Sequence, residues 1–264
     1  MSLVFAALSP HPPLLIPTIG RENLNKLEKT KQALEELEKA LYISQPDTLV
    51  LITPHGKIFK DSFTINANPE FNFDFKEFGD ISTQGNFKAD LNLIADVSNA
   101  AKNQNFPLIL NSEPSLDYGS AVPLYYLSRH LNRLKVVPIS YSLLELKRQV
   151  DFGYFLKEVF MNSAKRIAVI ASGDLSHCLS DSGPGGFSPA GKKFDDLVLE
   201  SLKNKNTTGL MNIEQTMSSE ARECGLRSLL ILMGVLRNVN YDLKIYSYES
   251  PFGIGHLVVN FSLE

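Results

Sequence analysis

Three of the five histidines occupy the same kind of place along this chain, each a few residues after a short apolar segment. His11 lies in Ser-Pro-His-Pro-Pro, His55 in Thr-Pro-His-Gly, and His177 in Ser-Gly-Asp-Leu-Ser-His. An imidazole titrates near neutrality and binds divalent transition metals, so it can serve proton transfer or metal coordination. Three histidines in equivalent positions favour one shared site over three separate structural roles.

A metal site built on two histidines needs a further protein ligand. Two histidines and one carboxylate form the open site of non-haem iron(II) oxygenases. Four carboxylates are candidates for this ligand: Asp117, Asp174, Glu220 and Glu223. Glu223 is the preferred candidate, because it extends the apolar stripe of a predicted helix and an inward carboxylate must be paired, protonated or bound to a metal. Glu220 is the substitute.

A cysteine offers an alternative third ligand. Cys224 directly follows Glu223 in the chain. A set of His11, His55 and Cys224 would suit zinc or copper as well as iron, whereas burial as an inert thiol is the common structural role of a free cysteine. The pattern leaves open whether Glu223, Glu220 or Cys224 completes the site.

The other two histidines have structural explanations. His130 lies near the end of a predicted helix, where a positive charge complements the helix dipole. His256 opens the last predicted strand, where it could line a pocket, and we expect a structural role for it.

The shared site requires elements that bring its histidines together. Four apolar segments without polar alternation predict strands buried on both faces: residues 3–8, 48–52, 134–139 and 166–170. Residues 243–248 and 256–261 alternate more and predict antiparallel or edge strands. Amphipathic patterns predict helices at residues 21–43, 90–102, 122–131, 144–162, 191–204 and 219–236. We therefore expect an α/β fold, a three-layer sandwich in which helices flank a central, largely parallel (mixed) sheet.

This fold would place the three histidines at one edge. Ligands of open α/β sheets bind outside the carboxyl ends of the strands, and each histidine follows such an end. We expect a single domain over residues 1–264, with residues 61–86 as a surface excursion or hairpin.

Composition excludes several classes of protein. The formal net charge is −3 over 264 residues, and nothing concentrates lysine or arginine, which argues against nucleic-acid binding. Two cysteines cannot form a disulfide framework, so a reducing compartment is expected. The chain has no basic residue before its first apolar stretch and no apolar run of membrane-spanning length. We expect a cytoplasmic protein that does not enter a membrane.

Five motifs in a fixed order resemble those of a known family. They are Ser-Pro-His11-Pro-Pro, Thr-Pro-His55-Gly, Leu-Asp117-Tyr-Gly-Ser-Ala-Val-Pro-Leu, Ser-Gly-Asp174-Leu-Ser-His177 and Glu223-Cys-Gly. Together they resemble the class III extradiol ring-cleavage dioxygenases of the catalytic B-subunit (LigB) type and their Memo-like relatives. The resemblance extends over nearly the whole chain.

The resemblance implies a role for each motif. His11, His55 and Glu223 look like ligands of iron(II), and His177 looks like the acid/base residue. We expect Asp174 and Tyr118 to be catalytic as well. Three further residues are expected to contact the substrate: Asp117, Ser120 and Cys224. The implied reaction is ring cleavage of a catechol or related aromatic with dioxygen.

Two departures from the family pattern keep other functions open. Many ring-cleaving members have histidine where this chain has Tyr118, and Glu223-Cys-Gly also resembles the Memo branch, in which ring cleavage is not expected. The alternatives are a Memo-like metal-binding or accessory protein without dioxygenase turnover and, more weakly, a zinc hydrolase. Zinc or copper could then replace iron. We expect a homodimer on base rates, with or without a separate small subunit.

Overall fold

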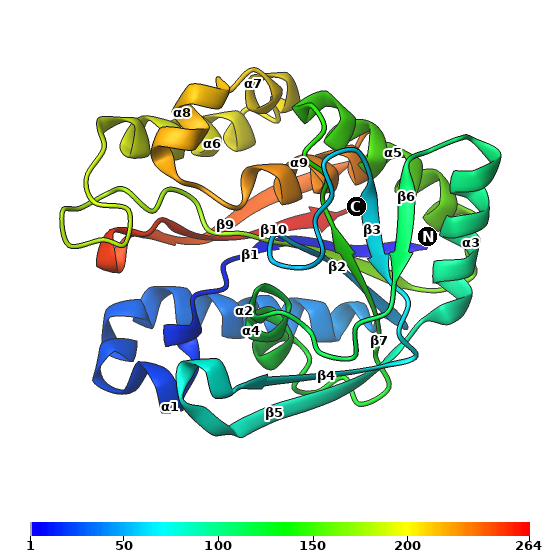
Figure 1. The fold of residues 1–264 in the computed structure, drawn as a ribbon, viewed down its shortest axis with the longest axis horizontal. Coiled ribbons are helices and arrows are strands. Elements are labelled where there is room, and N and C mark those ends of the chain that lie inside the picture. Colours follow the sequence, from blue (N-terminus) through cyan, green and yellow to red (C-terminus); the bar gives the residue numbers. More distant parts are fainter. Residues whose placement is uncertain (1) are drawn as a thin grey trace.

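A ten-stranded sheet runs through the protein, and helices cover both of its faces (Figure 1). The structure is a computed structural model that describes residues 2–264. The strands are β1 (Leu3–Ser9), β2 (Thr48–Thr53), β3 (Phe63–Asn66), β4 (Glu70–Phe75), β5 (Asp80–Ala89), β6 (Leu108–Asn111), β7 (Lys135–Ser140), β8 (Ile167–Ser172), β9 (Tyr241–Glu249) and β10 (His256–Leu263). The expected three-layer α/β sandwich is confirmed.

The centre of the sheet is parallel and its margins are antiparallel. The strand order is β4-β5-β7-β2-β8-β1-β10-β9, and β3 joins β7 to β6. The four predicted core strands are β1, β2, β7 and β8, which pair in parallel as immediate neighbours. Every residue of β2 and β8 is buried, as the continuous apolar runs predict. The antiparallel pairing expected for the last two strands is confirmed by β10, which lies between β1 and the edge strand β9.

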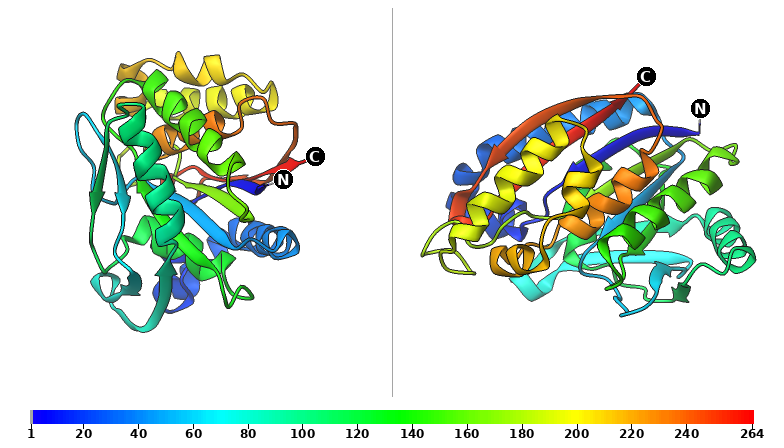
Figure 2. Two further views of the ribbon diagram at one scale, coloured as in Figure 1. Left: turned by 90° about the vertical axis from the view of Figure 1, so that its right-hand side faces the viewer. Right: turned by 90° about the horizontal axis from the view of Figure 1, so that it is seen from above.

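Two layers of helices enclose this sheet. The helices are α1 (Pro17–Gly20), α2 (Glu28–Ser44), α3 (Leu91–Asn103), α4 (Tyr118–Leu127), α5 (Leu146–Met161), α6 (Pro189–Lys203), α7 (Thr207–Met211), α8 (Gln215–Ala221) and α9 (Leu226–Val235). Helices α2 and α4 pack on one face, and α5 and α9 pack on the other, with α6 to α8 above them (Figures 1 and 2). None of the helices formed by residues 2–264 has the length and apolarity needed to span a membrane.

The expected excursion at residues 61–86 is largely part of the sheet. Its β3 pairs with β6 and β7, and its β4 forms an antiparallel hairpin with β5. The short strand β6 has no counterpart in the sequence-based prediction. Each of β3 and β6 is four residues long, too short for a hydrophobic period to mark it clearly.

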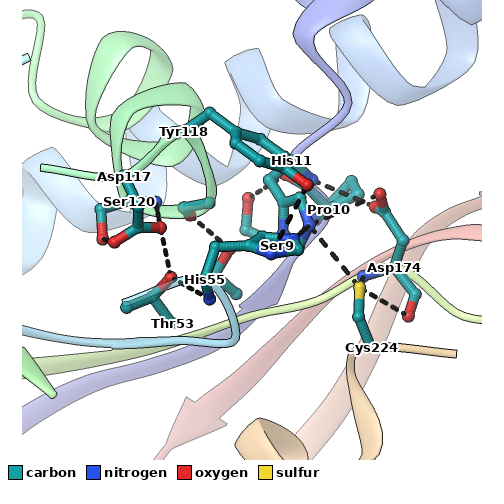
Figure 3. A network of polar contacts seen from close by, with 12 residues as sticks. Ser9, Pro10, His11, Thr53, His55, Asp117, Tyr118, Ser120, Asp174 and Cys224 are labelled. Carbon is teal, nitrogen blue, oxygen red and sulfur yellow. Dashed lines mark hydrogen bonds and ion pairs between the residues drawn. The ribbon is translucent and has the colours of Figure 1, made fainter. Parts of the chain in front are cut away.

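The helix predicted over residues 219–236 is wrong in one respect that matters for the site. The chain forms α8 and α9 with a break between them, and Arg222 ends α8 in the left-handed conformation (φ 52°). Residues 222–225 therefore form a turn, so Glu223 does not continue the buried stripe of α9. In this turn Cys224 points toward His11 (Figure 3).

Candidate metal centre

Adjacent parallel strands deliver the predicted site residues to one edge of the sheet. His11 follows β1 and His55 follows β2, while Asp174 and His177 lie in the loop after β8, the strand between those two. Pro10 and Pro54 precede the two histidines, and the fixed φ of proline stiffens both turns.

Two imidazoles and a thiol converge at this edge. His11 Nε2 lies 3.0 Å from His55 Nε2, and the two rings meet edge to face. The Sγ atom of Cys224 lies 3.6 Å from the same His11 nitrogen. Figure 3 shows Cys224 and His55 both directed toward His11. We refer to these three residues as the His–His–Cys group, whose ligand atoms all lie within 4.8 Å of one another.

The spacing of the His–His–Cys group fits one metal ion. A nitrogen about 2.0–2.1 Å and a thiolate sulfur about 2.3 Å from a common ion would lie roughly 3.0–3.6 Å apart at ordinary bond angles. Burial, assisted by the nearby His177, lowers the pKa of His11 to about 3. Burial and then the charge of His11 lower the pKa of His55 to about 4. Both imidazoles are therefore neutral at pH 7, the form that binds a metal.

Cys224 is a thiol in the absence of a metal. Burial raises the pKa of Cys224 well above its ordinary value, and the carboxylate of Asp174 raises it further. The backbone N–H of Asp174 donates to the Cys224 sulfur at 3.3 Å. A metal ion deprotonates a coordinating thiol outright, so the donor set of two imidazoles and one thiol is compatible with a divalent ion.

Asp174 and His177 lie next to this group. Together with Cys224 they form a second set of ligand atoms within 4.8 Å of one another. One oxygen of Asp174 accepts the backbone N–H of His11 at 3.1 Å, and the other lies 3.7 Å from His11 Nε2. His177 Nδ1 is buried and finds no hydrogen-bond partner among residues 2–264. The expected acid/base residue thus keeps hydrogen-bonding capacity for a ligand.

Tyr118 covers the two histidines. Its ring stacks on His55, with centroids 4.3 Å apart, and meets His11 edge-on at 5.6 Å. Its hydroxyl lies 3.5 Å from His55 Nδ1, and burial raises the pKa of Tyr118. Phe78, at the tip of the β4–β5 hairpin, packs edge-on against Tyr118. These rings form an aromatic wall over the site.

Asp117 and Ser120 are bonded to each other at the start of α4. The Asp117 carboxylate accepts the backbone N–H and the hydroxyl of Ser120, both at 3.0 Å, and the hydroxyl of Thr53 at 2.6 Å. Ser120 is fully buried. Asp117 also lines a cleft of about 330 Å³ that His55 borders.

The structure does not bring either glutamate to the two histidines. Both oxygens of Glu223 are occupied at 2.6–2.7 Å, by the hydroxyl of Ser218 and the backbone N–H of Leu226 in the first turn of α9. Glu220 is exposed on α8. Glu223 therefore stabilises the start of α9, and Cys224 supplies the third possible ligand atom beside the two histidines.

Two site residues were not found from the sequence. Ser172, the last residue of β8, has its hydroxyl 2.8 Å from His11 Nδ1. Gly119 allows α4 to approach closely, since a Cβ there would meet His55 Cδ2, Thr53 Oγ1 and Asp117 Oδ1 at 2.9 Å each. For Ser172 the available sequence signal was a serine at the carboxyl end of a buried strand. The role of Gly119 could be recognised only from the packing of α4 against the site.

The remaining histidines lie outside the His–His–Cys group. His130 pairs with Glu38 of α2 at 2.8 Å. His256 is buried, and both of its ring nitrogens lack a hydrogen-bond partner within residues 2–264. Burial lowers the pKa of His256 to about 4, opposed by Asp174 and assisted by His11 and His177, which places it within electrostatic range of the centre.

Comparisons with known proteins agree with this architecture. The chain is 33% identical over 268 residues to protein CA_C1420 of Clostridium acetobutylicum; the match covers 98% of this chain and 57% of that protein, so the chain spans little more than half of its relative. The crystal structure of uncharacterized protein JW3007 from Escherichia coli K12 has the same fold, with a TM-score of 0.68 and 15% identity over 98% of this chain and 99% of that one.

The match to a family model says more about function than the match to either protein does. Residues 5–259 match the family model described as the catalytic LigB subunit of aromatic ring-opening dioxygenase. That range includes every residue of the proposed centre, from His11 to Cys224. The chain belongs to the LigB family of aromatic ring-opening dioxygenase catalytic subunits.

Proposed function

We propose that this protein is a non-haem iron(II)-dependent extradiol dioxygenase that opens a catecholic ring with dioxygen. The observation that carries the proposal is the convergence of two neutral imidazole nitrogens, 3.0 Å apart, beside Asp174 and His177. Membership of the LigB family supports the reaction class. The substrate and the native metal are part of the proposal.

The chemistry divides between the metal and the chain. His11, His55 and Cys224 would hold the ion, which when bound supplies the redox chemistry that lets dioxygen react with a vicinal diol. One ring C–C bond beside a hydroxyl-bearing carbon breaks, and both oxygen atoms enter the product. Dioxygen is the only oxidant and no separate reductant is needed. His177 accepts a hydroxyl proton from the diol and returns a proton as the ring opens.

The other groups bind and orient the substrate. Tyr118 offers an aromatic face and a hydroxyl beside His55, which suits a flat phenolic ring. The cleft of about 330 Å³ next to His55 has room for a small molecule, and Asp117 is one of the residues that line it. Asp174, which holds the backbone of His11, keeps that histidine in place while His177 exchanges protons.

A second candidate function follows from Cys224. A thiol as the third ligand suits zinc or copper as well as iron, and the position that carries a substrate-facing histidine in many ring-cleaving relatives is Tyr118. Both features favour a metal-binding or accessory protein without dioxygenase turnover. We rank it second because Asp174 and His177 provide acid/base groups that such a protein does not require.

Oxygen consumption separates the two functions. Anaerobic loading with iron(II), followed by oxygen uptake on a panel of catechols, is expected to show turnover in the native chain. His177→Ala should lower that turnover by roughly 10²–10⁴-fold with the metal retained, and His130→Ala is the matched control. Tight zinc or copper binding that depends on Cys224, with no oxygen uptake on any catechol, would instead support the second function.

A further inference from the structure

Ser172 links three segments of the site through one hydroxyl. It is the last residue of β8 and has no exposed surface. Its Oγ atom donates to the backbone carbonyl of Gly119 at 2.5 Å and lies 2.8 Å from His11 Nδ1. Ser172 thus touches both the loop that carries His11 and the first turn of α4.

The sequence of α4 explains why the Gly119 carbonyl needs this donor. In a helix that carbonyl would accept the N–H of the residue four positions later, which here is Pro123. Proline has no N–H, so the helix cannot satisfy the carbonyl of Gly119. A buried carbonyl without a hydrogen-bond donor destabilises the fold, and here the Ser172 hydroxyl is that donor. The single proton of that hydroxyl is therefore committed to Gly119.

This commitment determines how His11 carries its own proton. A serine hydroxyl has one hydrogen to donate, so toward His11 it acts only as an acceptor. The contact at 2.8 Å then requires an N–H at Nδ1. A neutral imidazole, the form that binds a metal, has one N–H. The Nε2 atom of His11, which faces His55 and Cys224, carries the free lone pair.

We propose that Ser172 is a positioning residue that fixes the tautomer and orientation of His11 and so prepares Nε2 as a metal ligand. The proposal rests on the metal centre of the proposed function. Asp174 does not compete for the proton, since its nearer oxygen is 3.7 Å from Nε2 and its other oxygen accepts the backbone N–H of His11. Outer hydrogen bonds of this kind hold metal-binding histidines in their productive orientation.

The tautomer can be measured without any metal. In nitrogen-15 spectra of the metal-free protein labelled at histidine, His11 is expected to show a protonated Nδ1 and a bare Nε2. In Ser172→Ala the Nε2-protonated form should appear, because the acceptor for Nδ1–H is gone. A native His11 protonated at Nε2 would overturn the proposal, whether or not the protein binds metal or turns over a catechol.

Metal affinity gives the second readout, with cobalt(II) as the probe. Ser172→Ala should weaken cobalt binding by roughly 10–100-fold, and Ser172→Thr, which keeps the hydroxyl, should restore most of it. Ser228→Ala is the matched control, since Ser228 is equally buried and its hydroxyl has no partner within residues 2–264. A cobalt Kd for Ser172→Ala within twofold of the native value would contradict the proposal.

Pro123→Ala keeps the test decisive if Ser172→Ala does not fold. The alanine returns an N–H to the Gly119 carbonyl and releases the Ser172 proton, so both His11 tautomers should appear and cobalt should bind more weakly. An unchanged tautomer and affinity in Pro123→Ala would contradict the proton assignment. If the native protein turns over no catechol but its cobalt affinity still depends on Ser172, the dioxygenase reaction is refuted and the proposed role of Ser172 stands.

Discussion

The two edges of the same sheet bury ionisable groups in opposite ways. At the amino edge, Asp90 is almost fully buried and its carboxylate accepts from the Thr48 hydroxyl, the Lys165 ammonium and the backbone N–H of Leu93. Burial alone would raise the pKa of Asp90, but the hydrogen bonds from Lys165 and Thr48 outweigh it and lower the pKa. Asp90 therefore stays ionised, and its carboxylate is fully hydrogen-bonded by these three donors.

At the carboxyl edge the buried groups are kept neutral instead. Burial lowers the pKa of both His11 and His55 and raises the pKa of Cys224. These groups face one another, and the carboxylate oxygen of Asp174 beside them lies 3.7 Å from His11 Nε2. The amino edge therefore stabilises the fold, whereas the carboxyl edge gathers neutral ligand atoms that an added ion would bind together.

The largest expected effect belongs to the amino edge. Asp90→Ala removes the cap of α3, the partner of Lys165 and the acceptor of a buried hydroxyl. We expect a loss of about 3 kcal/mol in the free energy of unfolding at pH 7, with metal affinity unchanged. Urea unfolding of the metal-free protein measures it. Because the folded-state pKa is lowered, the deficit should shrink as pH falls below the ordinary value of 3.8.

Asp195 of α6 gives the opposite pH dependence. Its oxygens accept from Ser176 N–H at 2.9 Å and the Tyr248 hydroxyl at 2.6 Å, yet burial raises its pKa from 3.8 to about 6. The folded state therefore binds a proton more tightly than the unfolded chain does, and stability should fall by up to about 3 kcal/mol as pH rises from about 4 to 6.

Asp195→Asn tests that slope. The amide can donate to Tyr248 as a protonated carboxyl does, so the stability of the variant should be nearly flat from pH 4 to 6. Urea midpoints over this range provide the comparison. A variant that keeps the native slope would show that Asp195 is ionised throughout, as Asp90 is.

The third prediction concerns the thiol. Cys224→Ala should weaken cobalt or zinc binding by about a hundredfold or more, beyond the range of outer hydrogen-bonding partners. Titration of the metal-free protein measures the Kd. Cys178→Ala is the matched control, because that free cysteine is buried and its thiol donates to the carbonyl of Gly185. Equal Kd values for the two variants would remove Cys224 from the centre.

The smallest effect is expected at Glu223. Glu223→Gln should cost about 1 kcal/mol of stability, since it weakens the bond to the N–H of Leu226 at the start of α9. Metal affinity should stay within about threefold of the native value. Thermal unfolding and metal titration are both needed. A collapse of metal affinity in this variant would restore Glu223 as the third ligand.

The sequence predicts the parallel centre of the sheet well because the apolar runs of β1, β2, β7 and β8 are long and continuous. The positions of His11, His55 and His177 follow from those strand ends. The helix at α4 begins four residues before its predicted start, at the Asp117 cap.

The proposed third metal ligand could not be predicted in the same way. Glu223 fits a helical stripe only if residues 219–236 form one helix, and the left-handed Arg222 interrupts it. The position of Ser172 at a strand end was visible in the sequence, but its role was not, since that role depends on a carbonyl that Pro123 leaves free on a different segment. Both depend on contacts between segments far apart in the chain, which hydrophobic periodicity does not encode.

Metal stoichiometry tests the central claim most directly. After anaerobic loading with iron(II) and removal of excess metal, elemental analysis should find about one ion per native chain and per His130→Ala chain. The double variant His11→Ala/His55→Ala should retain almost none. Equal metal content in the native protein and the double variant would contradict a metal centre at the carboxyl edge of the sheet.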